Sequence, residues 1–299
     1  MAREDTALLR LMPWVFVLIW STGFVVARFG MPNSPPFSFL SVRYALSVAC
    51  FAVWIALVRA VWPSGARQWG HLAVTGVLMH AGYLGGVWAA IKQGVGAGTV
   101  ALLVGLQPVL TALWMGWVAR RDSDAPTLQW RHWLGLLLGL IGLMLVVWPK
   151  IGIGEVTLAN LALGVFALFS ITAGTLYQKH FLAPTDVRTA SAIQLFAALL
   201  ITAPLAWFET EAIRWNGQVF GAMAWSVLVL TLGGSSLLYL LIQRGAATRV
   251  TSLMYLVPPC TASLAWLLFG EVVTLAMVAG MALTVAGVAM VLRQGKAAQ

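Results

Sequence analysis

The second half of this chain repeats the first at a nearly constant spacing, and each half contains five long apolar runs. Residues around Pro108 recur 150 positions later around Pro258. The matching residues are Leu103, Leu106, Thr111 and Ala112 in the first half and Leu253, Leu256, Thr261 and Ala262 in the second. A unit that crosses a bilayer an odd number of times is inverted in its second copy. Inverted repeats form alternating-access carriers, whose substrate site lies near mid-membrane between the repeats.

The apolar runs predict ten membrane spans. Hydrophobic residues make up 61% of the 299 residues and charged residues only 9%, whereas a soluble domain is about 45–50% apolar and about 25% charged. A spanning helix needs about 20 mostly apolar residues. The runs lie at 11–30, 36–58, 69–91, 97–119, 130–148, 156–178, 186–207, 218–242, 246–268 and 272–292. We therefore expect an all-α membrane protein of ten transmembrane helices, arranged as two inverted five-helix repeats over residues 1–149 and 150–299, without a soluble domain.

The basic residues predict the orientation of these spans. Thirteen fall on one side: Arg3, Arg10, Arg59, Arg67, Arg120, Arg121, Arg131, Lys179, Arg188, Arg244, Arg249, Arg293 and Lys296. Four fall on the other: Arg28, Lys92, Lys150 and Arg214. Cytoplasmic loops carry the excess of Lys and Arg, so we expect both termini in the cytoplasm. This topology explains the net charge of +9 without a nucleic-acid partner, which would need one basic face.

Polar and amphipathic side chains within the spans are candidates for a substrate cavity, because a polar group facing lipid is costly. His80 and Tyr83 are three residues apart, so they share one helix face next to Gly85 and Gly86. The full set of candidate substrate-binding residues is Trp20, Ser21, His80, Tyr83, Gln107, Tyr177, Gln194, Tyr239 and Tyr255. The alternative for each is a packing role, since hydroxyl and amide groups also join membrane helices to one another.

Two prolines and a set of small residues predict mechanical parts. Pro108 and Pro258 occupy matched positions of the two repeats, and proline kinks a helix, so both are predicted to act in gating. The alternative is that membrane helices simply tolerate proline. Small residues spaced by three and four residues predict close packing of the fifth span on the tenth: Gly135, Gly139, Gly142, Gly280, Thr284 and Gly287.

Two charged residues lie at or inside the spans. Arg43 is a candidate partner for an anionic group of the substrate; alternatively it reaches the outer interface or pairs with Glu271. Glu271 begins the last span, where a negative charge suits a helix N-terminus. No carboxylate lies mid-span, so either His80 couples protons or transport is not proton-coupled.

The chain resembles the drug/metabolite transporter superfamily, and most closely its EamA-type exporters of the YddG kind, which export aromatic amino acids. The resemblance is carried by Trp20-Ser21-Thr22-Gly23-Phe24, Phe39-Leu40-Ser41-Val42-Arg43-Tyr44, Gln107-Pro108-Val109-Leu110-Thr111-Ala112-Leu113 and Phe269-Gly270-Glu271 with Gly280 and Gly287. It implies a multi-pass protein of the bacterial inner membrane, with helices one to four and six to nine around a central cavity, supported by helices five and ten. One departure is Ala119-Arg120-Arg121-Asp122 with its longer loop, because the first half in this family usually repeats, at the end of its fourth helix, the acidic residue that Glu271 represents in the second half.

We therefore expect a monomeric transporter that exports amino acids, with aromatic or other apolar side chains favoured, and related small metabolites. Drug or cationic-dye efflux is an alternative, although it usually requires a buried acid. A passive metabolite channel is another alternative, although such pores favour rings of repeated subunits. An enzyme would need a nucleophile–base set or a metal cluster. The four histidines, His71, His80, His132 and His180, have no ligand-like spacing, so we expect no enzyme, metal or cofactor.

Overall fold

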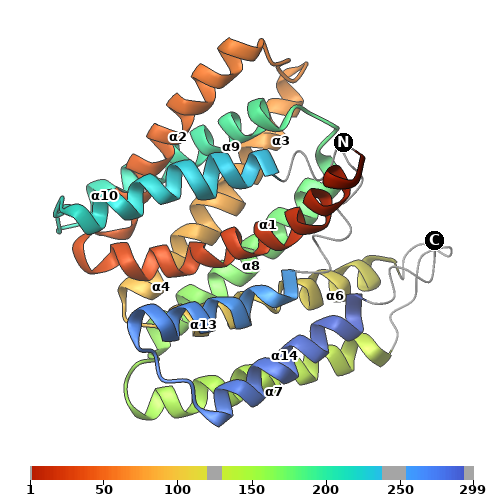
Figure 1. Ribbon diagram of the computed structural model, residues 1–299, viewed down its shortest axis with the longest axis vertical. Helices are drawn as coiled ribbons and strands as arrows, with labels where there is room; N and C mark the ends of the chain where they lie inside the picture. Colours follow the sequence, from red (N-terminus) through yellow and green to blue (C-terminus); the bar gives the residue numbers. More distant parts are fainter. Residues whose placement is uncertain (1, 120–129, 238–253, 293–299) are drawn as a thin grey trace.

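The computed structural model describes residues 2–119, 130–237 and 254–292 (Figure 1), and these residues form helices and connections without a strand. Within these residues, eight helical segments are long and apolar enough to cross a membrane: Leu11–Asn33, Pro36–Val58, Ala66–Lys92, Ala97–Trp117, Trp130–Gly152, Leu158–Phe181, Val187–Trp207 and Gly217–Leu237. Two shorter apolar helices follow, Val257–Phe269 and Leu275–Met290. These segments coincide with the ten predicted spans, so the predicted fold class is confirmed.

Several spans are single helices, and others are interrupted. The uninterrupted ones are α1 (Ala2–Gly30), α2 (Pro36–Val58), α7 (Trp130–Gly152), α8 (Leu158–Phe181), α9 (Val187–Trp207) and α14 (Leu275–Leu292). The third span consists of α3 (Ala66–Gly76), the π-helix η2 (Val77–Leu84) and α4 (Gly85–Lys92). The fourth consists of α5 (Ala97–Val104) and α6 (Gln107–Ala119). The eighth contains α10 (Gly217–Ala224) and the π-helix η3 (Trp225–Gly233), and the ninth contains η4 (Met254–Leu256) and α13 (Val257–Phe269).

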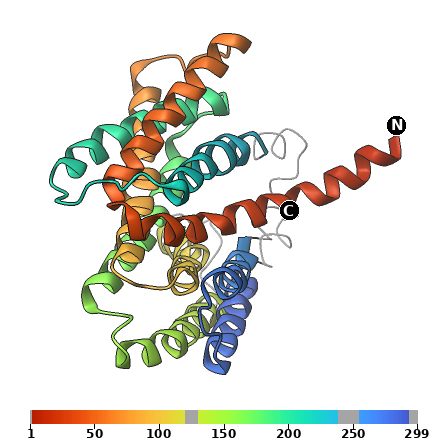
Figure 2. The same cartoon turned by 60° about the vertical axis from the view of Figure 1, so that its left-hand side comes forward.

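The helices run roughly alongside one another, and the first helix is the longest. The start of α1 and the end of α14 lie on the same side of the molecule (Figure 1), as an even number of spans requires. Figure 2 shows that the N-terminal end of α1 extends beyond the other helices. Large apolar side chains cover the outside; Leu158, Trp207 and Leu275 are each 86% exposed or more. Such an apolar exterior is stable only in lipid.

Helices α7 and α14 pack side by side at one end of the molecule, away from α2 and α9 (Figure 1). A Cβ on Gly142 would overlap the carbonyl oxygen of Gly280, so both residues must be small for the backbones to approach this closely. Thr284 Oγ1 donates a hydrogen bond of 2.9 Å to the Gly280 carbonyl and lies 3.5 Å from that of Gly139. The predicted packing of the fifth span on the tenth is confirmed.

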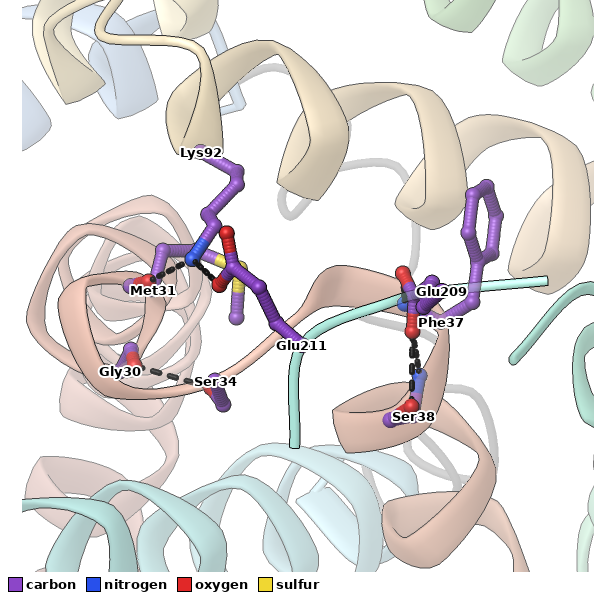
Figure 3. A network of polar contacts seen from close by, with 8 residues as sticks. All are labelled: Gly30, Met31, Ser34, Phe37, Ser38, Lys92, Glu209 and Glu211. Atoms are coloured by element: carbon purple, nitrogen blue, oxygen red, sulfur yellow. Dashed lines mark hydrogen bonds and ion pairs between the residues drawn. The ribbon is translucent and has the colours of Figure 1, made fainter. Parts of the chain in front are cut away.

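Helices α2 and α9 pack at the opposite end, and a residue beyond α9 caps the start of α2. Pro35 and Pro36 begin α2 without a capping side chain of their own. Glu209 supplies the missing acceptor: its carboxylate accepts hydrogen bonds from the backbone N–H groups of Phe37 (2.8 Å) and Ser38 (2.7 Å), as Figure 3 shows. A carboxylate at a helix N-terminus satisfies free N–H groups and the helix dipole.

Candidate functional site

A cavity of about 690 Å³ lies among the first, second, third, sixth, seventh and eighth spans. Helix α1 contributes Trp20 and Phe24, and α2 contributes Arg43. The π-helix η2 contributes His80 and Tyr83, while α9 contributes Gln194 and η3 contributes Thr231. Ligand sites in proteins typically measure about 300–1,000 Å³ and combine apolar walls with a few polar groups. The cavity therefore has the size and composition of a small-molecule site.

The two π-helices occupy equivalent places in the two halves, and both face the cavity. A π-helix makes i→i+5 hydrogen bonds, is rare, and is frequent at functional sites. Other helices satisfy the carbonyl groups of η2: Tyr44 Oη donates to the His80 carbonyl at 2.9 Å, and Ser170 Oγ donates to the Leu78 carbonyl at 2.7 Å. In η3, Thr231 Oγ1 donates to the Ser226 carbonyl, five residues earlier, at 2.8 Å.

Arg43 is buried on the cavity wall, with 7% of its surface exposed. Its Nη2 donates a hydrogen bond of 3.2 Å to Thr231 Oγ1, and its guanidinium carbon lies 5.8 Å from the centre of the Trp88 ring. Its Nε is buried without a hydrogen-bond partner. No carboxylate among the described residues forms an ion pair with it. The side chain therefore presents an unneutralised positive charge to the cavity.

The two structural alternatives for Arg43 are not observed. Glu271 does not pair with it, because Glu271 Oε1 accepts a hydrogen bond of 3.1 Å from the backbone N–H of Ala97, at the start of α5. Its burial also shows that the guanidinium does not reach the outer interface. Glu271 lies at a helix N-terminus as expected for its charge, although that helix is α5 and not the last span.

Five of the predicted site residues line this cavity: Trp20, Arg43, His80, Tyr83 and Gln194. They come from four spans and from both halves of the chain, which the fold brings together. Of these, His80 and Tyr83 come from one face of the third span, as their spacing indicates. Sequence reasoning missed Thr231 and Trp88; the neighbouring Gly233 and Gly234 were the only signal that the helix containing Thr231 is irregular.

Three further predicted residues lie outside the cavity lining and contact neighbouring groups. Ser21 is buried and donates a hydrogen bond of 2.7 Å to the Val17 carbonyl. Gln107 Nε2 donates to Thr175 Oγ1 at 2.9 Å, joining α6 to α8. Tyr177 Oη and His71 Nδ1 are 2.8 Å apart, joining α8 to α3. Tyr239 and the side chain of Tyr255 lie outside the described part of the chain.

The two candidate gating prolines lie in the first turns of helices that follow interruptions. Pro108 is the second residue of α6, after the break at Gly105 and Leu106, and Pro258 is the second residue of α13. These breaks meet, because a Cβ on Gly105 would lie 2.9 Å from Pro258 Cγ.

A polar network joins the helix ends beyond Trp88. Lys92 Nζ forms an ion pair of 2.6 Å with Glu211 Oε2 and donates a hydrogen bond of 3.2 Å to the Met31 carbonyl (Figure 3). The hydrogen bond from Lys92 and its charge lower the pKa of the Glu211 carboxyl below its ordinary value. At the other end, the cavity lining extends to Lys179, Pro184 and Thr185, around the α8–α9 connection.

Comparison with known proteins identifies relatives along nearly the whole chain. The profile of the EamA-like transporter family matches residues 11–148 and again 158–293. The uncharacterized transporter YvbV of Bacillus subtilis is 24% identical, over 94% of this chain and 90% of its own length. A probable amino-acid metabolite efflux pump of Salmonella typhimurium is 23% identical, over 96% of this chain and 94% of its own length. A protein of known crystal structure, 17% identical, matches with a TM-score of 0.66 over 97% of this chain and 99% of its own.

Proposed function

The chain belongs to the EamA-like transporter family, and we propose that it exports amino acids, with aromatic or other apolar side chains favoured, and related small metabolites by alternating access. The family and the named relatives are transporters, and one relative is named a probable amino-acid metabolite efflux pump. The proposal for this chain adds a substrate, a direction and a mechanism to that family assignment.

The observation that carries the proposal is the buried Arg43 on the cavity wall, which forms no ion pair with a described carboxylate. A charge in the membrane interior is costly, so it usually pairs with another group or marks a substrate path. A substrate carboxylate could accept hydrogen bonds from the guanidinium, whose Nε has no partner. A charge-assisted bond of this kind is roughly twice as strong as a neutral one. Arg43 is therefore the proposed binding group for the substrate carboxylate.

The remaining wall favours an apolar substrate body. Trp20, Phe24 and Tyr83 line the cavity, and Trp88 lies beside the guanidinium of Arg43. Aromatic side chains bury large apolar areas and pack well against other rings. His80 and Gln194 add polar groups on the third and seventh spans. An amino acid with an aromatic or large aliphatic side chain matches this combination.

The proposed direction is supported by the orientation that the basic residues predict, because it opens the cavity to the cytoplasm, where an exported substrate is taken up. In that orientation Lys179 and Thr185 lie at the cytoplasmic surface, so the cavity runs from mid-membrane to the cytoplasmic side. The network of Lys92 and Glu211 then closes the periplasmic side. Transport requires the Lys92–Glu211 network to open as the cytoplasmic end closes around the substrate. Two inverted repeats supply such paired states by exchanging conformations.

Counterflow in proteoliposomes tests the proposal. Vesicles loaded with unlabelled phenylalanine should accumulate labelled phenylalanine transiently and saturably, which a passive channel does not do. Arg43→Gln should reduce the rate at least tenfold, and Arg43→Lys should retain part of it. The matched control is Arg67→Gln, which removes an exposed positive charge outside the cavity lining and should leave the rate unchanged. Full activity of Arg43→Gln would remove the proposed role of Arg43.

A further inference from the structure

The charge on the described cavity wall is entirely positive. Buried Arg43 and exposed Lys179 line the cavity, and none of its described lining residues is acidic. The acidic residues in the described ranges whose side chains are placed each have a partner elsewhere. Glu155 binds Lys150, Asp186 binds Arg188, Glu209 caps α2, Glu211 binds Lys92 and Glu271 accepts from Ala97.

Several polar acceptors of the two π-helices already have donors. Thr231 Oγ1 accepts from Arg43 and donates to the Ser226 carbonyl. The carbonyl of His80 accepts from Tyr44 Oη, and that of Leu78 accepts from Ser170 Oγ. The cavity wall therefore offers the positive charge of Arg43 together with π-helix acceptors that already have donors, and the other polar lining groups, such as Ser191, Gln194 and Ser235, carry no negative charge.

The guanidinium of Arg43 acts in opposite directions on the two charges of an amino acid. A carboxylate is attracted to the unpaired guanidinium, but an ammonium on the next carbon lies within a few ångströms of the same positive charge. Like charges at this separation repel one another, most strongly where water is excluded. A substrate whose nitrogen is acylated or absent keeps the attraction and loses the repulsion.

We infer that the cavity recognises a carboxylate without requiring an ammonium, so its preferred substrates are monoanionic carboxylic acids with an apolar or aromatic body, such as N-acylated or deaminated derivatives of amino acids. This inference rests on the proposed function, because it assigns a substrate class to the same cavity and to Arg43. It also assigns Thr231 a positioning role, since its hydroxyl holds the guanidinium on the cavity wall.

Competition with labelled phenylalanine in the same counterflow assay tests the inference at pH 7.5. The competitors are unlabelled phenylalanine, N-acetylphenylalanine and phenethylamine, which carry both charges, only the carboxylate and only the ammonium. We expect N-acetylphenylalanine to compete at a concentration at least tenfold lower than phenylalanine, and phenethylamine not to compete. Direct binding of N-acetylphenylalanine to detergent-purified protein should show the same order.

Two variants locate the effect. Arg43→Gln should abolish binding of N-acetylphenylalanine. Thr231→Val, which keeps the charge of Arg43, should weaken that binding several-fold. The control Arg67→Gln should leave the binding unchanged. Monodisperse elution and unchanged helical circular dichroism establish that each variant is folded. If phenylalanine competes tenfold better than N-acetylphenylalanine, the inference is overturned while the proposed function stands. If phenylalanine is not transported but N-acetylphenylalanine is, through Arg43, the inference stands and the proposed amino-acid substrate fails.

Discussion

Gly105, in the break between α5 and α6, lies directly against Pro258, at the start of α13. A Cβ at position 105 would lie 2.9 Å from the ring carbon Cγ of Pro258. The interruptions of the fourth and ninth spans, which occupy matched positions in the two repeats, therefore contact each other. Any movement of one half against the other at this point changes that contact.

Gly105→Ala should destabilise the packed arrangement of the two breaks, because a proline ring cannot rotate away as a flexible side chain can. We expect a lower thermal midpoint for the detergent-purified protein and slower counterflow. The double variant Gly105→Ala/Pro258→Ala should recover part of the loss, since it removes the ring carbon that the new methyl group meets. Additive losses in the double variant would show that the contact is not the cause.

Pro108→Ala and Pro258→Ala should each slow transport more than they weaken substrate binding. Each proline lies in the first turn of a helix after a break, where its missing N–H costs little and its ring restricts how the break can bend. The cost of the substitution therefore falls on the change between states and not on substrate contacts. Turnover and equilibrium binding should be measured on the same preparation; unchanged turnover in both variants would argue against a gating role.

Tyr44→Phe should destabilise η2. Tyr44 is fully buried, and its hydroxyl is the donor to the carbonyl of His80. Leaving a buried acceptor unsatisfied costs about 1–3 kcal/mol, so the thermal midpoint should fall by several degrees. Phe51→Leu changes a buried residue of the same helix outside the cavity lining and is a control for general packing loss. It should also lower the midpoint but leave the substrate preference of the cavity unchanged. Tyr44→Phe should alter that preference.

Cysteines introduced at positions 80 and 83 should react with a water-soluble thiol reagent, in a background with Cys50 and Cys260 replaced by alanine. Both native side chains line the cavity, so substrate should slow the reaction. A cysteine at Leu200, 58% exposed on the apolar outside, should stay unreactive because lipid covers it. Unreactive cysteines at both cavity positions in a protein that still transports would place the substrate path elsewhere.

Glu211→Gln should loosen the network of Lys92 and Glu211, which we propose closes the cavity beyond Trp88. The hydrogen bond from Lys92 lowers the pKa of the Glu211 carboxyl. The ion pair therefore contributes fully to closure at any pH above the ordinary pKa of a glutamate, and it loses that contribution only as the pH falls through the lowered pKa. Closure should therefore not change between about pH 5 and 8. Reactivity of a cysteine at Trp88 towards an impermeant reagent added outside should rise in Glu211→Gln. The exchanged pair Lys92→Glu/Glu211→Lys should restore protection.

The ten spans could be predicted because lipid leaves few alternatives, and the two related halves because residues around Pro108 recur around Pro258. Backbone polar groups in a bilayer must be satisfied within helices, so runs of about 20 apolar residues mark them directly. The packing of α7 on α14 was equally predictable, since glycines and Thr284 spaced by three and four residues form one narrow face. These features depend on periodicity within short segments of the sequence.

It was harder to predict which polar residues line the cavity, because residues of similar chemistry in different spans have different surroundings. His80 and Tyr177 are both polar-capable residues in apolar spans, yet His80 lines the cavity and Tyr177 bonds to His71. Two π-helices, which place His80, Tyr83 and Thr231 on the cavity wall, had no reliable sequence signal. Their wide turns are intrinsically less favourable, so they persist only where donors such as Tyr44 and Ser170 satisfy their carbonyl groups.

Apolar runs, a recurring residue pattern and the spacing of small residues were thus sufficient to predict the membrane spans, the repeat and the scaffold helices, since these features lie in the sequence itself and in its fit to lipid. Only the tertiary structure decided that Arg43 meets Thr231, 188 residues away in the sequence, and that no described carboxylate neutralises it. Such a pairing depends on how α2 and η3 approach across the two halves, and that approach is set by the packing of all the spans between them.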